Sequence, residues 1–238
     1  RFINALDHFG WRFKSHGSTS ESDGSHPQAI LPVSDIETFR NAASSAVERY
    51  FTSQEPGQID RDTQSLKLRP VLSREGVLDI EVSQTPPVPM ANLFPSNPLP
   101  APSEITPPLL KQGYRVTLDP GSTTPSSHTE YKTTPRPQYD LSRARAGLVN
   151  ETEPREVLLW NPDDYIMEGS RTNVYLYRAG RWVTPSEDTG CLKGTERRWL
   201  LAHKMVEVED VRVNDVRDGE VVLLSNGLRG IWGATVSR

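Results

Sequence analysis

The sequence predicts a mixed α/β (α+β) protein with two domains. Residues 36–50 place apolar side chains at helical spacing on one face, behind a capping box. Residues 174–177 instead alternate valine and leucine with two tyrosines, which is the period of a half-buried strand. Residues 119–127 (DPGSTTPSS) have the composition of a linker. The 238 residues suffice for one large or two small globular domains, each with a core.

Composition and charge narrow the classes of function. The net charge of -4 gives no electrostatic case for a nucleic acid or a membrane surface, and no apolar run is long enough to span a membrane. The single cysteine, Cys191, precludes an intramolecular disulfide and suits a reducing compartment, so we expect a cytoplasmic protein. Because the chain begins with Arg1 and not with Met, we also expect residues before it, and a targeting signal among them stays open.

Residues 1–118 are expected to form a small α/β domain. Periodicity and turn residues predict its elements in this order: a helix at residues 1–11 that ends at Gly10, a polar loop at 17–28, a helix at 36–50, hairpin strands at 66–73 and 77–82, a proline-rich extended segment at 85–113, and a strand at 114–118. We place the domain boundary at the linker, residues 119–127.

Residues 128–238 are expected to form a larger second domain. Its predicted elements are a helix at residues 138–146, strands at 174–177 and 181–184, a helix that opens at Gly194-Thr195, and strands at 206–208 and 220–224. Ala179-Gly180 supplies the turn between the first two strands, and Pro185 ends the second of them.

Two chemical features lie close together in this domain. Glu168, in the motif Glu-Gly-Ser-x-x-Asn, places a carboxylate on a strand. Gly194 and Thr195 open a helix, where free backbone N–H groups and the positive end of the helix dipole favour an anion of phosphate size. The pair predicts a site at which a carboxylate and a bound anion are neighbours.

Three segments agree in order and spacing with a known family: Glu168 to Asn173, Thr184-Pro185, and Gly194-Thr195 followed by Arg197. They resemble the class IV aminotransferases, which are pyridoxal-phosphate enzymes of fold type IV. The resemblance covers nearly all of the chain and is firmest from Lys132 onward. It implies a small α/β domain, a larger domain built around a barrel-like sheet, pyridoxal 5'-phosphate between them, and a homodimer. Family members have several strands before the first helix, so we expect the small domain to be incomplete at its N-terminus.

The resemblance also implies the residues that bind the cofactor. Lys132 takes the position of the Schiff-base lysine and would be catalytic; such a lysine must be able to lose its charge in a partly desolvated site. Lys193, beside the anion site, is its competitor. Glu168 would face the ring nitrogen and keep it protonated. The other cofactor-binding residues implied by position are Arg1, Tyr139, Asn173, Gly194, Thr195, Glu196, Asn226, Gly227 and Leu228.

Some of these residues have a structural explanation of similar weight. Arg1 is a chain-end residue, Tyr139 would serve equally as an amphipathic core side chain, and a lysine such as Lys132 is most often a solvated surface charge. Glu196 replaces a residue that commonly donates to phosphate in relatives, and its carboxylate would repel a phosphate unless it turns away. No metal site is predicted.

Within the family the chain looks most like fungal-type 4-amino-4-deoxychorismate lyases, in His8-Phe9-Gly10-Trp11, Lys132-Thr133-Thr134 and the loop from Ser225 to Gly230. This implies a lyase that converts 4-amino-4-deoxychorismate to 4-aminobenzoate and pyruvate for folate biosynthesis. The first alternative is an aminotransferase for branched-chain amino acids, D-amino acids or amines, and the second is a catalytically inactive relative. The candidates to bind a substrate carboxylate are Arg69, Arg136 and Arg229, although an exposed strand arginine is the simpler interpretation of Arg69.

Overall fold

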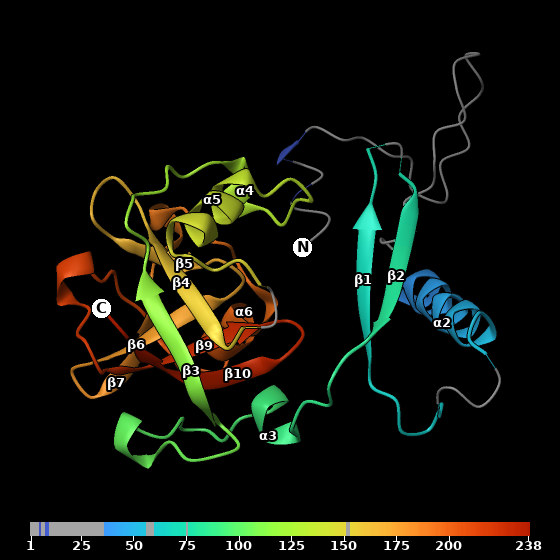
Figure 1. Cartoon of the computed structure of the whole chain (residues 1–238), viewed down its shortest axis with the longest axis horizontal. Helices are drawn as coiled ribbons and strands as arrows, with labels where there is room; N and C mark the ends of the chain where they lie inside the picture. The colour runs from blue at the N-terminus through green and yellow to red at the C-terminus, as the bar shows by residue number, and fades with distance from the viewer. Residues whose placement is uncertain (1–4, 6–7, 10–35, 56–59, 75, 151–152) are drawn as a thin grey trace. The chain divides into compact units, whose positions relative to one another are not determined.

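The computed structural model describes residues 5, 8–9, 36–55, 60–74, 76–150 and 153–238. The chain divides into two compact units, Arg1–Pro87 and Val88–Arg238, which are described separately (Figure 1). Of the helix expected at residues 1–11, only three residues are described, and among them the Phe9 N–H donates to the Ala5 carbonyl at 2.9 Å, as in a helical turn. Arg1 and the loop expected at residues 17–28 lie outside the described residues.

The first unit contains one long helix and one hairpin. Helix α2 (Ile36–Thr52) packs against β2 (Leu78–Gln84), which pairs in antiparallel register with β1 (Leu66–Leu72). The expected helix and hairpin are therefore confirmed. Gly76 has a φ of 84° in the turn, a left-handed conformation that glycine adopts without strain.

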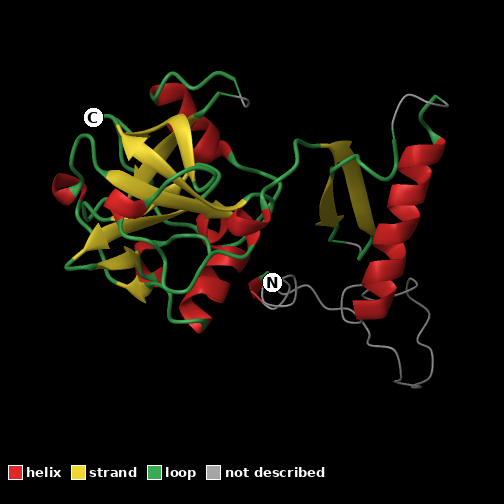
Figure 2. Ribbon diagram, turned by 90° about the horizontal axis from the view of Figure 1, so that it is seen from below, coloured by secondary structure: helices red, strands yellow, loops and turns green. Residues whose placement is uncertain are grey.

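The second unit is built on one curled, mixed sheet of eight strands, ordered β5-β4-β3-β10-β9-β6-β7-β8 (Figures 1 and 2). The strands are β3 (Leu110–Leu118), β4 (Arg155–Trp160), β5 (Ile166–Gly169), β6 (Asn173–Arg178), β7 (Arg181–Thr184), β8 (Glu207–Val208), β9 (Val221–Asn226) and β10 (Gly230–Val236). The α-helices of this unit are α3 (Met90–Leu93), α4 (Ser127–Glu130), α5 (Pro137–Arg145) and α6 (Thr195–Ala202). Short 3-10 helices span Pro102–Glu104, Glu187–Thr189 and Val213–Asp215. Among the described residues, no helix has the length and apolar character needed to cross a bilayer.

Both faces of this sheet are covered, which explains why its central strands are apolar almost throughout. Successive side chains of a strand point to opposite faces. On β9, Val222 and Leu224 accordingly pack in one core cluster, whereas Leu223 packs in another, together with Leu200 of α6. A third cluster joins Tyr139 of α5 to the far end of the sheet.

The division of the chain differs from the boundary expected at residues 119–127. Strand β3 precedes these residues, yet it pairs in parallel with both β4 and β10 and so belongs to the second unit. The segment with linker composition is fastened to this sheet. The buried carboxylate of Asp119 accepts from the Arg145 guanidinium at 2.7 and 2.6 Å, and the Thr123 N–H donates to the Trp160 carbonyl at 2.7 Å.

The proline-rich segment is also more structured than expected. It contains α3 and the 3-10 helix Pro102–Glu104, and it buries Leu99 and Ile105 in the core of the second unit. Its proline content indicates extended backbone, but it does not reveal that apolar residues between the prolines pack against the sheet.

Candidate active site

The site begins at Glu168, a buried carboxyl on β5. Tyr139 of α5 donates its phenolic O–H to Glu168 Oε1 at 2.6 Å, and the Leu192 N–H donates to Oε2 at 3.2 Å. Burial raises the pKa of Glu168 to about 8, while the bonds from Tyr139 and Leu192 and the charge of Arg136 act in the opposite direction. Burial and the Glu168 charge also raise the pKa of Tyr139, so the phenol remains a donor. A cation beside Glu168 would hold its carboxyl in the ionised form.

Helix α5 brings a second side chain to this carboxyl. The Arg136 guanidinium lies over the Tyr139 ring, 4.4 Å from the centroid, and donates to the Ser170 carbonyl. Arg136, expected to contact substrate, is thus held between α5 and the turn that follows Glu168.

That turn joins β5 to β6 and is shaped by Glu156, a residue that the sequence analysis did not single out. The buried Glu156 side chain accepts from the Ser170 N–H at 3.1 Å, the Ser170 hydroxyl at 2.5 Å and the Thr172 hydroxyl at 3.2 Å. A Cβ on Gly169 would lie 2.9 Å from Glu156 Cγ, so this glycine allows the close approach. In the sequence, Glu156 could have been noticed as the one acidic residue next to the apolar residues of β4.

The start of β6 lies against the start of α6. Asn173 Nδ2 donates to the Leu192 carbonyl at 2.7 Å, and a Cβ on Gly194 would overlap Asn173 Oδ1. Gly194 is the N-cap of α6 and offers no side chain to accept from the first-turn N–H groups. Helix geometry leaves those N–H groups without an intrahelical acceptor. The start of α6, where the sequence predicts an anion site, thus lies next to Asn173.

Within α6, Glu196 and Arg197 have different environments. Arg197 is 1% exposed and donates to the Pro185 carbonyl at 2.7 Å, which links two of the motif segments. Glu196 is half-buried, and its Oε1 atom is buried without a hydrogen-bond partner in the described part of the chain. Burial raises the pKa of Glu196 to about 7. A carboxyl that is partly protonated near neutral pH repels an anion less than an ionised one.

The two candidate lysines are also placed differently. Lys193 forms an ion pair with Glu187 at 2.7 Å, which raises its pKa and keeps it charged. The charges of Tyr131 and Glu130 also raise the pKa of Lys193. The segment that carries Lys132 therefore lies near the start of α6. Lys132 itself is exposed between α4 and α5, and the partial desolvation expected of a Schiff-base lysine is not seen in this structure.

The loop between β9 and β10 borders the same site. Ser225 pairs with Asn173 across the sheet, and its hydroxyl lies 2.8 Å from the Tyr175 hydroxyl. Asn226 Oδ1 accepts from the backbone N–H of Leu228 at 3.0 Å and of Arg229 at 2.9 Å. The N–H of Leu228, one of the expected cofactor-binding residues, is therefore already used inside the loop.

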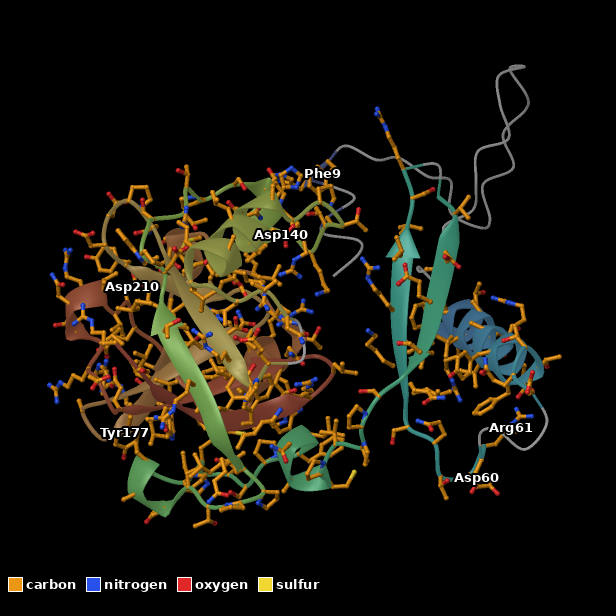
Figure 3. All side chains as sticks on the ribbon, in the orientation of Figure 1. Phe9, Asp60, Arg61, Asp140, Tyr177 and Asp210 are labelled. Atoms are coloured by element: carbon orange, nitrogen blue, oxygen red, sulfur yellow. The ribbon has the colours of Figure 1, made fainter. Side chains whose placement is uncertain are left out.

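Two expected residues stand apart from this group. Arg69, in the first unit, pairs with Glu81 at 2.8 Å on the hairpin, and both side chains are about half exposed; this geometry agrees with an ordinary strand arginine. Arg229 is exposed at the end of the β9–β10 loop. A cavity of about 530 Å³ opens at the opposite end of β6 from Asn173, lined by residues that include Tyr177, which Figure 3 labels, and it contains none of the candidate residues.

Comparison with curated proteins gives two partial matches. Aminodeoxychorismate lyase of Saccharomyces cerevisiae is 35% identical over 126 residues, covering 47% of this chain and 34% of the yeast protein. A Schizosaccharomyces pombe protein named "Putative aminodeoxychorismate lyase" is 31% identical over 128 residues, covering 52% of this chain and 55% of that protein. The chain thus spans about a third and about half of the lengths of these relatives.

Solved structures and a family comparison agree on the fold. A structure from Legionella pneumophila named "Putative 4-amino-4-deoxychorismate lyase" has a TM-score of 0.61 at 15% identity, covering 100% of this chain and 75% of that one. A "Putative amino-acid aminotransferase" from Mesorhizobium loti has a TM-score of 0.56 at 21% identity, covering 83% and 87%. The expected α/β fold class is confirmed. The family described as amino-transferase class IV matches residues 28–236. The chain belongs to the class IV aminotransferase family.

Proposed function

We propose that this chain acts as a pyridoxal-phosphate-dependent lyase that converts 4-amino-4-deoxychorismate to 4-aminobenzoate and pyruvate. The carrying observation is the buried Glu168 carboxyl, oriented by Tyr139 and Leu192, close to the uncapped start of α6. The choice of lyase rests on the similarity to proteins named aminodeoxychorismate lyase, at 35% and 31% identity.

The residues present fit the proposed cofactor, pyridoxal 5'-phosphate. Glu168 is a buried carboxyl with a pKa of about 8, and a protonated ring nitrogen beside it would favour its ionised form. The first-turn N–H groups of α6, behind the glycine at position 194, suit its phosphate. When bound, the cofactor supplies an electron sink for the charge that develops on the substrate carbon.

In the proposed reaction, each side chain of the site would have a separate role. Lys132 holds the cofactor and moves the proton from the amine-bearing carbon of the substrate, after which the enolpyruvyl group leaves and the ring becomes aromatic. Glu168 keeps the ring nitrogen protonated, and Tyr139 keeps the Glu168 carboxyl in place. Lys193 is the weaker candidate for the Lys132 role because its ion pair with Glu187 favours the charged ammonium.

We also propose the setting in which the enzyme works: a homodimer, in the cytoplasm, in folate biosynthesis. The homodimer is proposed because class IV aminotransferases usually form homodimers. The pathway is proposed because of the expected product, 4-aminobenzoate. The compartment is supported by the single cysteine, Cys191, which is buried as a free thiol. Sedimentation of the purified protein with the cofactor would report the oligomeric state directly.

The decisive assay supplies 4-amino-4-deoxychorismate, with pyridoxal phosphate and no keto acid. We expect many turnovers of pyruvate and 4-aminobenzoate from the wild type and from Lys193→Ala, and none from Lys132→Ala. Turnover that requires both an amino acid and a keto acid would instead identify an aminotransferase. Cofactor binding without product in either assay would identify a catalytically inactive relative.

A further inference from the structure

Two positive side chains lie at the end of the sheet where β3 and β10 begin. The two strands are parallel neighbours, with Leu110 opposite Gly233, so Lys111 and Arg229 lie at the same end of the sheet. Partial burial lowers the pKa of Lys111, and the positive charge of Arg229 lowers it further. The two charges are therefore close enough to repel each other, which costs free energy in the folded protein.

These cations lack the acidic neighbours that other basic side chains of the unit have. Arg145, Arg178 and Lys193 each pair with a carboxylate at 2.6 to 2.8 Å. Across the described residues, by contrast, no ion pair joins Lys111 or Arg229 to an acidic side chain. A bound anion would offset the repulsion between these two cations.

A buried aromatic pair lies beneath this cluster. Lys111 Nζ lies 5.0 Å from the centroid of the Tyr114 ring, which meets Trp232 edge-on at 5.9 Å. Burial and the charge of Glu156 raise the pKa of Tyr114 to about 12, whereas the charges of Arg171 and Arg229 lower it, so the phenol is influenced by both arginines and by one buried carboxylate. Lys111 of β3, Arg171 of the β5–β6 turn and Arg229 of the β9–β10 loop thus all act on one buried aromatic side chain.

The cluster borders the candidate active site. Arg229 ends the loop whose first residues are Ser225 and Asn226, and the Arg229 N–H is held by Asn226 Oδ1. Ser225 pairs with Asn173, which contacts the start of α6. Arg171 lies in the turn that follows Glu168. A substrate whose amine reaches the cofactor would have a second part within reach of this cluster.

We propose that Lys111 and Arg229 form a subsite for a substrate carboxylate that takes no part in the bond changes. The inference rests on the proposed function and deepens it, because 4-amino-4-deoxychorismate carries two carboxylates. It assigns to this pair the selection of dicarboxylates over substrates with one carboxylate. Lys111 is thereby a specificity residue that the sequence motifs do not reveal.

The test uses chorismate, a dicarboxylate of the same skeleton with a hydroxyl where the substrate has its reactive amine. Its affinity for the cofactor-loaded protein is measured by calorimetry and by tryptophan fluorescence, for the wild type, Lys111→Gln, Arg229→Gln and the double variant. Arg115→Gln is the matched control, because it removes one positive charge from an exposed position on the same strand. We expect each single variant to bind about three- to tenfold more weakly, since both cations are partly exposed, and the control to bind normally.

Salt and cofactor measurements complete the design. Rising ionic strength should weaken chorismate binding by the wild type more than by the double variant, while the absorbance of the bound cofactor stays equal in all proteins. Equal chorismate affinity in the wild type and the double variant would overturn the subsite and leave lyase turnover as separate support for the function. Failure of the wild type to bind chorismate, together with absence of lyase turnover, would overturn both.

Discussion

At the scale of single residues, the candidate site is a set of polar groups buried together. Glu168 and Glu156 are both almost fully buried, at 2% and 1% exposure, yet Glu168 accepts two hydrogen bonds and Glu156 accepts several. Such groups are costly to bury and are retained where their partners are precisely arranged. Glu156 accepts its bonds from the turn that presents Ser170, whereas Glu168 accepts from two donors among the described residues, Tyr139 and Leu192.

The raised pKa of Glu168 predicts how stability depends on pH. The ordinary carboxyl value is 4.5 and the folded value is about 8, so the folded state binds this proton more tightly than the unfolded state. The stabilisation that comes from this carboxyl is therefore full below pH 4.5 and is lost as the pH rises through about 8. Without cofactor, we expect the melting temperature to fall by at least about 3 °C between pH 5 and pH 8, which corresponds to about 1 kcal/mol in a protein of this size.

Substitution identifies the group responsible for this pH dependence. Glu168→Gln cannot ionise and should flatten the curve of melting temperature against pH. Glu196, whose pKa is raised to about 7, also lowers the melting temperature as the pH rises, but by less. Glu196→Gln should therefore flatten the curve less than Glu168→Gln does. Asp140→Asn, an exposed position on α5 labelled in Figure 3, is the control and should leave the curve unchanged. A steep curve that persists in Glu168→Gln would show that this carboxyl does not cause the pH dependence.

At the scale of elements, the contact between β6 and α6 depends on the absence of a side chain at position 194. We predict that Gly194→Ala destabilises the protein by about 1–3 kcal/mol, because its Cβ would overlap Asn173 Oδ1 in a packed region. Denaturant unfolding measures this change. The double variant Gly194→Ala, Asn173→Ala removes the overlap and should lose less stability than the sum of the two single variants. Additive losses would place the cause elsewhere.

The elements also show what the sequence can and cannot predict. The hairpin of the first unit, helix α5 and the start of α6 follow from local periodicity and turn residues, and all were predicted. The place of β3 could not be predicted, because its partners β4 and β10 are distant in the chain and the polar segment after it resembles a linker. That segment is held by the buried pair of Asp119 and Arg145, and a long-range ion pair leaves no local pattern.

The same distinction applies to the site. Glu168, Asn173 and Gly194 were predicted from motif spacing, and the structure brings them together. The link between Tyr139 and Glu168 crosses 29 residues and was not expected, although each residue was a candidate. Lys111 lies outside every motif, and only the sheet topology brings it to Arg229.

At the scale of the whole molecule, every described candidate except Arg69 lies in the second unit, Val88–Arg238. A ligand that binds the folded form of this unit and not its unfolded form stabilises it by mass action. Pyridoxal phosphate at a hundredfold excess over its dissociation constant contributes about 2.7 kcal/mol, or about 5–10 °C in melting temperature for a unit of this size. Four of the five tryptophans lie in this unit, so their fluorescence reports its unfolding.

We therefore predict that pyridoxal phosphate raises the fluorescence-detected melting temperature by about 5–10 °C, and that inorganic phosphate, which reaches only the start of α6, raises it less. Lys132→Ala should retain the response to phosphate but lose most of the additional response to the cofactor, because it removes the proposed attachment point. Lys193→Ala should retain both responses, since its ammonium is already paired with Glu187. If the cofactor still raises the melting temperature of Lys132→Ala fully but no longer raises that of Lys193→Ala, then Lys193 is the attachment point. No response in the wild type would show that the geometry around Glu168 serves a different ligand.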